Sequence, residues 1–210
     1  VFHLNKAATI YWVNGHSQKP IEIFEQAIKQ SSKIGNLNAI KTFYTNIGLI
    51  YTDNEDFSKA LQAFSKSLEV SRQMNRKSDI AASLLNLANV HSEMNNFNEA
   101  LKNLDEATSL GKDLNDERLL RSCYSLLANL YEKLGNTQKS AEYFSLFTTI
   151  SRKIQREEAR AREGEAKKIV DEAKSKVSAI ELAKQATEME LLDKQRVLEE
   201  TEHTLEELEQ

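Results

Sequence analysis

A short phrase recurs in this sequence at intervals of 40 residues, and this period restricts the possible folds more than any other feature. Residues 46–64 read NIGLIYTDNEDFSKALQAF, and residues 86–104 read NLANVHSEMNNFNEALKNL. A repeat of this length indicates units that bury their apolar faces by stacking on one another, so the sequence predicts a solenoid. Four copies keep a small residue and, three places later, a residue with a ring: Ala8, Gly48, Ala88 and Ala128, followed by Tyr11, Tyr51, His91 and Tyr131.

Each copy reads as two helices joined by a polar turn. Asn, Asp and Thr in these turns can accept hydrogen bonds from the free N–H groups that open the second helix. We predict that small residues such as Gly48 and Ala60 let the two helices approach closely, with Tyr51 and Phe64 filling the space beside them. The second half of the copies agrees less closely than the first: Pro20, Ala60, Ala100 and Ser140, followed by Phe24, Phe64, Leu104 and Phe144.

The composition favours an all-helical chain. One proline and six glycines in 210 residues leave little room for the turns of a β fold. The chain is 40% hydrophobic and 29% charged, and no segment approaches the ~18 consecutive apolar residues of a membrane-spanning helix. We therefore predict no membrane insertion of this segment. A net charge of −4 argues against nucleic acid as the main partner.

The single cysteine bears on the compartment. Cys123 has no second cysteine to pair with, which suits a reducing environment. We expect a cytoplasmic location, or a periplasmic one if a membrane anchor lies outside this chain. Because the sequence starts at Val1 without a methionine, we also expect it to be part of a longer protein.

The arrangement of a small residue, Tyr three places later, then Ala and Phe resembles tetratricopeptide repeats (TPR), in the variety with about 40 residues per unit. This resemblance implies an all-α fold, a right-handed solenoid of helix-turn-helix repeats. It covers residues 1–152, in repeats of about 1–40, 41–80, 81–120 and 121–152. Two residues depart from the family pattern. Pro20 replaces a small residue and marks a helix start, and Phe147 is large where a small residue is expected, which suggests that no fifth repeat follows.

The composition changes after the last repeat. Residues 153–210 lack aromatic residues and proline, and several Glu residues stand four places before a Lys or Arg, a spacing that supports an isolated helix. We predict a long charged helix that forms a coiled coil, which Gly164 could interrupt. Polar residues such as Lys184 and Thr187 interrupt its heptads, so we expect only a weak homodimer. The apolar seam consists of Val170, Val177, Ile180, Leu191, Leu198, Leu205 and Leu208.

Motifs of catalysis are absent from the sequence. It holds no Gly-rich phosphate loop, no His-Glu-x-x-His, no cysteine pair for zinc and no Gly-x-Ser-x-Gly. We therefore predict no enzyme, no metal site and no cofactor. We expect Cys123 to be a small buried hydrophobe and His91 to occupy the Tyr position of its repeat. The tail resembles the linkers that follow TPR arrays in bacterial sensor histidine kinases, which implies an output module beyond Gln210. The residues around His203 lack the phosphoacceptor box of such kinases.

The TPR resemblance also implies a groove lined by the first helix of each repeat. Asn side chains both donate and accept hydrogen bonds, so Asn89 and Asn129 are the best candidates to hold a peptide backbone. The alternative is that these amides only hydrate an exposed helix face. Trp12 is either an aromatic anchor at the end of the groove or a residue that an upstream repeat covers. The candidate groove residues are Asn5, Thr45, Asn89, Ser125, Asn129 and Glu132.

Two functions of different class fit these features. In the first, the chain is the sensory or regulatory region of a signalling protein, in which the repeats bind a protein or peptide and a dimeric coiled coil relays the bound state. In the second, it is a non-enzymatic scaffold whose tail is a docking or oligomerisation element. Nucleic-acid binding through RKIQREEARAR is disfavoured because carboxylates interleave the cations.

Overall fold

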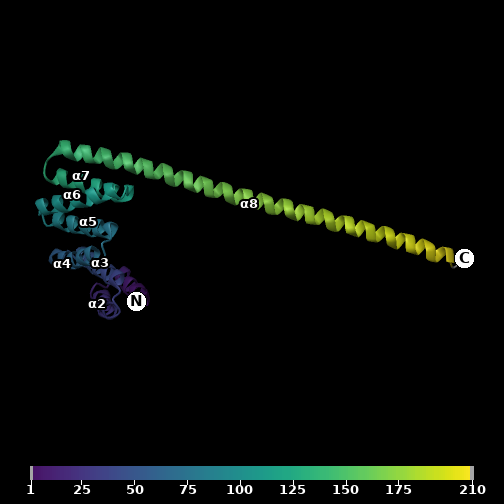
Figure 1. The fold of residues 1–210 in the computed structure, drawn as a ribbon, viewed down its shortest axis with the longest axis horizontal. Coiled ribbons are helices and arrows are strands. Elements are labelled where there is room, and N and C mark those ends of the chain that lie inside the picture. The colour runs from purple at the N-terminus through teal and green to yellow at the C-terminus, as the bar shows by residue number, and fades with distance from the viewer. Residues whose placement is uncertain (1, 209–210) are drawn as a thin grey trace. The chain divides into compact units, whose positions relative to one another are not determined.

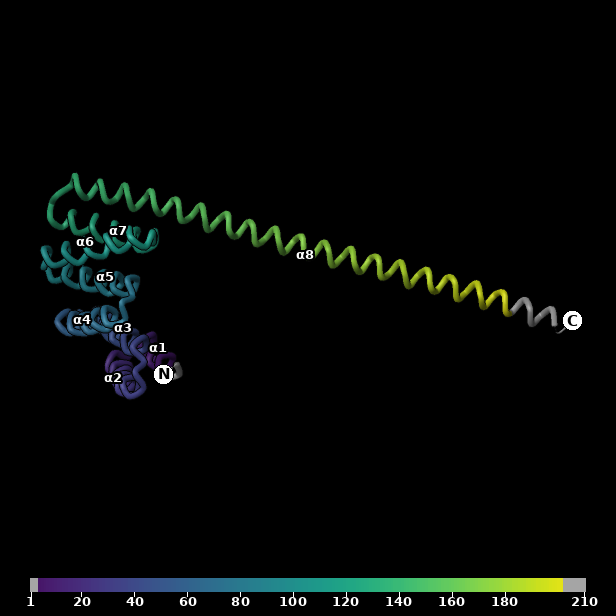
Figure 2. Tube along the Cα trace, viewed as in Figure 1, coloured from purple at the N-terminus to yellow at the C-terminus, as the bar shows by residue number. Residues whose placement is uncertain are grey.

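The computed structural model describes residues 2–208, with side chains for residues 4–201, and this part of the chain is helical without strands. Helices α1 to α7 stack one after another, with odd-numbered and even-numbered helices alternating (Figure 1, Figure 2). The predicted all-α TPR-like solenoid is confirmed. The helices are α1 (Phe2–Val13), α2 (Gln18–Lys33), α3 (Leu37–Asp53), α4 (Phe57–Gln73), α5 (Lys77–Glu93), α6 (Phe97–Asp113), α7 (Glu117–Lys133) and α8 (Thr137–Leu208).

Every turn between consecutive helices has the same backbone geometry, so the local period is 20 residues. A residue with positive φ, between 51° and 82°, closes each helix. The N–H of the next residue then donates to a carbonyl five residues back, as Asp56 does to Tyr51 and Asn136 does to Tyr131, both at 2.9 Å. This is the hydrogen bond that closes a Schellman motif. The left-handed residues are Gly15, Gly35, Glu55, Asn75, Asn95, Asn115 and Gly135.

Side chains in these turns cap several of the following helices. Asp56 accepts from the N–H of Lys59 at 3.3 Å, and Asn136 accepts from the N–H of Lys139 at 3.1 Å. These two bonds confirm the predicted capping by turn residues. Thr137 is instead the first residue of α8, and Asn96 makes no side-chain cap bond.

Small residues allow the two helices of a repeat to pack closely, as predicted. A Cβ atom added at Gly48 on α3 would lie 2.5 Å from the Phe64 ring on α4. Phe64 in turn packs against Leu87 and Val90 on α5, the first helix of the next repeat. One aromatic side chain therefore joins its own repeat to the following one.

The chain divides into two compact units, residues 1–154 and 155–210, and α8 contributes to both. In the first unit, Tyr143, Phe147 and Ile150 of α8 pack against the core of the last repeat, and Ile154 is 5% exposed. Phe144 is 58% exposed although its equivalents Phe24 and Phe64 are buried, because no further helix covers it in the described chain. The predicted boundary at residues 152/153 lies close to this division.

The second unit is a solvent-exposed stretch of α8. The helix continues through Gly164, and its side chains from residue 159 to residue 201 are all exposed. Ion pairs one turn apart run along it, including Lys194 with Glu190 at 2.7 Å and Lys184 with Glu188 at 3.6 Å. Such pairs contribute only ~0.2 to 0.5 kcal/mol each. His203, Leu205 and Leu208 lie outside the residues whose side chains are described.

Candidate peptide-binding groove

The candidate groove residues lie on the odd-numbered helices, and side-chain bonds join neighbouring helices of this row. The Asn46 amide on α3 donates to the Asn5 amide oxygen on α1 at 3.1 Å. The Trp12 Nε1 atom donates to the Asp53 carboxylate at 3.1 Å. Asn5 and Trp12 are thus both engaged within the array, and their polar atoms are only partly available to a ligand.

Thr45 points toward the second helix of its own repeat. Its Oγ1 atom lies 2.8 Å from the Ser67 Oγ atom on α4 and donates to the Lys41 carbonyl at 3.0 Å. Ser67 is buried and lies 3.3 Å from Ser83 on α5, whose Oγ is 3.5 Å from that of Ser71. Thr45 therefore belongs to a row of hydroxyls that joins α3, α4 and α5.

Sequence reasoning missed this hydroxyl row. The available signal was Ser67, which stands where the first and third repeats have Ala27 and Ala107. A buried polar group needs a hydrogen-bond partner, so a serine at a core position predicts a second polar group close to it. The partners Thr45 and Ser83 lie on two different helices. The sequence does not show that both side chains come close to Ser67.

Asn89 on α5 and Asn129 on α7 occupy equivalent places, one repeat apart. Asn89 is half-buried and Asn129 is exposed. Within the described part of the chain, neither side-chain amide makes a hydrogen bond to another residue. Each amide therefore keeps its two donor hydrogens and its acceptor oxygen for a ligand.

The remaining candidates flank Asn129 in sequence. Ser125 is half-buried and Glu132 is exposed, both on α7. Close to Glu132, the Lys133 ammonium pairs with Glu93 on α5 at 3.1 Å, which joins the last turns of α5 and α7. The row thus carries neutral amides and hydroxyls with a charged pair at one end.

Burial shifts the pKa values of His91 and Cys123. Burial lowers the pKa of His91 below its ordinary value, although the nearby Glu99 carboxylate opposes the shift. Burial also raises the pKa of the Cys123 thiol, which is fully buried, so the expected role as a small core residue is confirmed. The environment of Cys123 does not suit a reactive thiol, because a low thiol pKa accompanies reactive cysteines.

No group of three His, Cys, Asp or Glu side chains within the described chain is arranged to hold a metal ion. None of the described helices combines the length and apolar character needed to cross a membrane.

Comparison with protein families supports the repeat type. Residues 122–154 match the tetratricopeptide repeat family, and residues 44–134 match the family of anaphase-promoting complex subunit 5. No curated protein matches the sequence significantly.

Solved structures share the fold at low sequence identity. BtubC from P. vanneervenii matches with a TM-score of 0.65 and 19% identity over 72% of this chain, and this chain spans 63% of BtubC. A putative kinesin light chain from Podosopora anserina with TPR-like repeats matches at 0.60 and 21%, covering 73% of this chain and 75% of that one. A Rap protein in complex with Competence and Sporulation Factor matches at 0.62 and 21%, covering 70% of this chain and 42% of that one.

The helical repeats are thus of the tetratricopeptide type. The family match falls on the last repeat, and the structural matches cover about 70% of the chain, close to the share that the repeats occupy. A fold of this type does not by itself define a ligand.

Proposed function

We propose that the repeats bind a protein or peptide segment along the odd-numbered helices. The observation that carries this proposal is the pair of unengaged amides, Asn89 and Asn129, at equivalent places on α5 and α7. An extended backbone presents N–H and C=O groups at regular intervals, and a side-chain amide satisfies one of each. The Rap protein that was solved with Competence and Sporulation Factor shows that a related fold accommodates a factor. Here Ser125 and Glu132 would contact the same segment, with Asn5 and Thr45 contributing through their remaining polar atoms.

The proposal extends to signalling through the tail. We infer that residues 153–210 form a dimeric coiled coil that relays the occupied state of residues 1–152 to an output module, as in a sensor histidine kinase. The predicted seam is solvent-exposed in the single chain: Val170 is 50% exposed, Val177 55%, Ile180 67%, Leu191 60% and Leu198 58%. Apolar positions at heptad spacing favour association with a second helix. We place this region in the cytoplasm, in keeping with the unpaired Cys123.

A scaffold without an attached enzyme is the second candidate. The family of anaphase-promoting complex subunit 5, which residues 44–134 match, takes its name from a subunit of a larger complex. In this case the tail would dock to another component of an assembly. The binding surface on the odd-numbered helices would be the same.

Removal of the two amides tests the proposed binding surface. Random peptides displayed on phage are selected on the wild-type chain, and the best peptide is titrated against a variant with Asn89→Ala and Asn129→Ala. We expect the double variant to lose about tenfold or more in affinity, equal to ~1.4 kcal/mol. Its thermal stability should stay within about 0.5 kcal/mol of the wild type, because the substitutions remove no internal bond.

A matched substitution on the other row serves as the control. Asn98→Ala changes an exposed Asn on α6, an even-numbered helix, and should leave the affinity unchanged. Equal affinity of the wild type and the double variant would eliminate the odd-numbered helices as the binding surface.

A further inference from the structure

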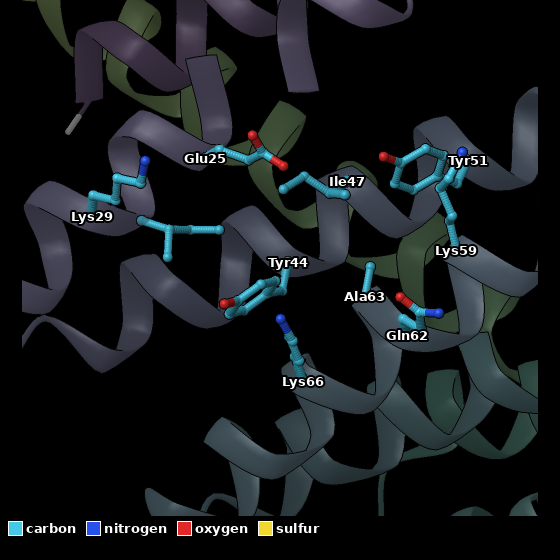
Figure 3. Close-up of a pocket in the computed structure, with 10 residues that line it drawn as sticks. Glu25, Lys29, Tyr44, Ile47, Tyr51, Lys59, Gln62, Ala63 and Lys66 are labelled. Atoms are coloured by element: carbon cyan, nitrogen blue, oxygen red, sulfur yellow. The ribbon is translucent and has the colours of Figure 1, made fainter. Parts of the chain in front are cut away.

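A furrow of about 440 Å³ lies between the second helices of the first two repeats, on a surface that the proposed groove does not use. Helices α2 and α4 form its walls, and α3 contributes Tyr44, Ile47 and Tyr51 to its lining. Figure 3 shows the two Tyr rings projecting from α3, with Ala63 of α4 directed between them. The other lining residues are Glu25, Ile28, Lys29, Lys59, Gln62 and Lys66.

The chain contains a second version of this furrow, in which a tyrosine fills the space. Eighty residues further along, Tyr124, Tyr131 and Lys139 repeat the arrangement of Tyr44, Tyr51 and Lys59, but Tyr143 replaces Ala63. The Tyr143 ring stacks on Tyr131 with centroids 5.5 Å apart and an interplanar angle of 2°. Its centroid lies 6.0 Å from that of Tyr124. The fold itself therefore shows that an aromatic ring fits between these two tyrosines.

The spacing of the two tyrosines along α3 indicates that an aromatic ring also fits into the first furrow. Tyr44 and Tyr51 are seven residues apart, or about 10 Å along the helix at ~1.5 Å per residue. One ring at the stacking distances seen for Tyr143 spans such a gap. Ala63 is too small to enter it, so none of the described lining residues places a ring between the two half-buried tyrosines. Stacking of an aromatic pair stabilises by ~0.5 to 1.5 kcal/mol beyond area burial.

The equivalent surface between α4 and α6 lacks this arrangement. Leu84 and His91 stand where the first furrow has its two tyrosines, and Asn103 stands in place of Ala63. Glu106, at the position of Lys66, is bound by the Arg72 guanidinium at 2.9 Å. The unfilled space between two tyrosines is therefore a feature of the first furrow and is not repeated between α4 and α6.

Cations surround the first furrow. The Lys59 ammonium lies 5.3 Å from the centre of the Tyr51 ring, and the Lys66 ammonium lies 5.3 Å from the centre of the Tyr44 ring. Lys29 adds a third exposed cation, whereas Glu25 is the single carboxylate among the described lining residues. The Lys59 ammonium also pairs with the Asp56 carboxylate at 2.6 Å, so Lys29 and Lys66 supply the excess of positive charge at this surface, in a chain whose net charge is −4. This local excess is complementary to an acidic partner.

We propose that the α2–α4 furrow is a second docking site, which receives a tyrosine side chain from an acidic segment of a partner protein. The ring inserts between Tyr44 and Tyr51, as Tyr143 does between its own neighbours, and acidic residues beside it pair with Lys29 and Lys66. The site is separate from the odd-numbered helices, so it stands whether or not that surface binds a peptide.

The first test is an NMR titration of the full chain with the peptide acetyl-Glu-Asp-Tyr-Asp-Glu-amide. We expect saturable shifts of the Ala63 amide and of the Tyr44 and Tyr51 ring signals. A control peptide with Ala in place of Tyr should cause no saturable shift at these positions, and a peptide with Lys in place of the four acidic residues should bind much more weakly. Equal shifts with the Ala peptide would show that no ring is received, and would overturn the proposal.

Substitutions in the protein form the second test. Ala63→Tyr supplies the missing ring from the chain itself, so binding of the peptide should fall below detection. Asn103→Tyr, which places a tyrosine at the equivalent position on α6, should leave binding unchanged. Undiminished binding by a folded Ala63→Tyr variant would overturn the proposal.

The lysines give a readout that does not depend on packing. Lys29→Gln combined with Lys66→Gln should weaken peptide binding roughly three- to tenfold at low salt. Lys102→Gln, an exposed cation on α6, is the matched control and should have no effect. If Ala63→Tyr fails to fold, this pair decides, because equal affinities of the double variant and the control would contradict the proposed site.

Discussion

Two glycines show that a Gly→Ala substitution can destabilise one unit of the chain and stabilise the other. Gly48 lies against the Phe64 ring, where an added Cβ would approach to 2.5 Å, whereas a Cβ at Gly164 would meet nothing within 4 Å. We expect Gly48→Ala to destabilise the repeats by about 1 to 3 kcal/mol through overpacking. Gly164→Ala should increase helicity of the tail, since Ala is favoured over Gly by about 1 kcal/mol in a helix.

Thermal unfolding and circular dichroism at 222 nm measure these two effects. The melting temperature of the repeats should fall only for Gly48→Ala, and the helical signal should rise only for Gly164→Ala. A Gly48→Ala variant as stable as the wild type would mean that α3 and α4 are less closely packed than described.

His91 makes the stability of the array depend on pH. Its pKa is lowered by burial, so the unfolded chain binds a proton at a higher pH than the folded chain does. The contribution of neutral His91 to stability is therefore complete above its unfolded pKa and is lost as the pH falls through the folded value. Its Nδ1 atom has no hydrogen-bond partner within the described chain, and the nearby Glu99 carboxylate offsets the effect of burial only in part.

The substitution His91→Tyr tests this dependence, because Tyr occupies the equivalent places 51 and 131. Urea unfolding at several values between about pH 7 and pH 5 should show a steeper loss of stability for the wild type than for the variant. Parallel losses in the two proteins would assign the pH dependence to other groups.

At the scale of the elements, the seven turns with a left-handed residue set the spacing of the helices. Glu55 is the exception among them, because the other positions hold Gly or Asn. A side chain with φ of 59° costs ~1 to 2 kcal/mol, and Asn tolerates this conformation better than Glu. We expect Glu55→Asn to raise the free energy of unfolding by about 0.5 to 1 kcal/mol in a urea titration. Gly35→Ala, at the equivalent place in the preceding turn, should lower it by a similar amount.

These turns also show what the sequence could and could not predict. Gly15, Gly35 and Gly135 mark three of them, and the repeat period predicts where the others fall. Glu55 carries no such signal, because the fold imposes its conformation. The sequence shows Ala63 where the equivalent position holds Tyr143. Only the stacking of Tyr143 against Tyr131 in the structure shows that this difference leaves space for a ring. Likewise, the hydrogen bond between Thr45 and Ser67 joins α3 to α4, and the sequence spacing of the two residues does not predict that they are in contact.

At the scale of the whole molecule, the tail determines association between chains in this account. Leu191 and Leu198 belong to the exposed seam, whereas Leu192 is equally exposed but lies off it. A variant with Leu191→Glu and Leu198→Glu should abolish the weak, concentration-dependent dimer that we expect of the wild type, because charge in the seam opposes helix pairing. Sedimentation equilibrium measures it, with Leu192→Glu as the control.

A shorter chain distinguishes the tail from the repeats as the source of association. Residues 1–155 retain the first compact unit and should be monomeric. Dimerisation of this piece with the affinity of the full chain would move the contact to the repeats, and the relay through a coiled coil would lose its basis.

The central claim is that Asn89 and Asn129 hold a partner segment, and their side-chain NH₂ signals report on it most directly. The full chain, labelled with ¹⁵N, is titrated with the peptide selected on it, and the amide signals are followed by NMR. We expect the NH₂ signals of Asn89 and Asn129 to shift together to saturation with one affinity, while that of Asn98 on α6 stays in place. Unchanged Asn89 and Asn129 signals at saturation, with shifts elsewhere in the chain, would contradict the claim.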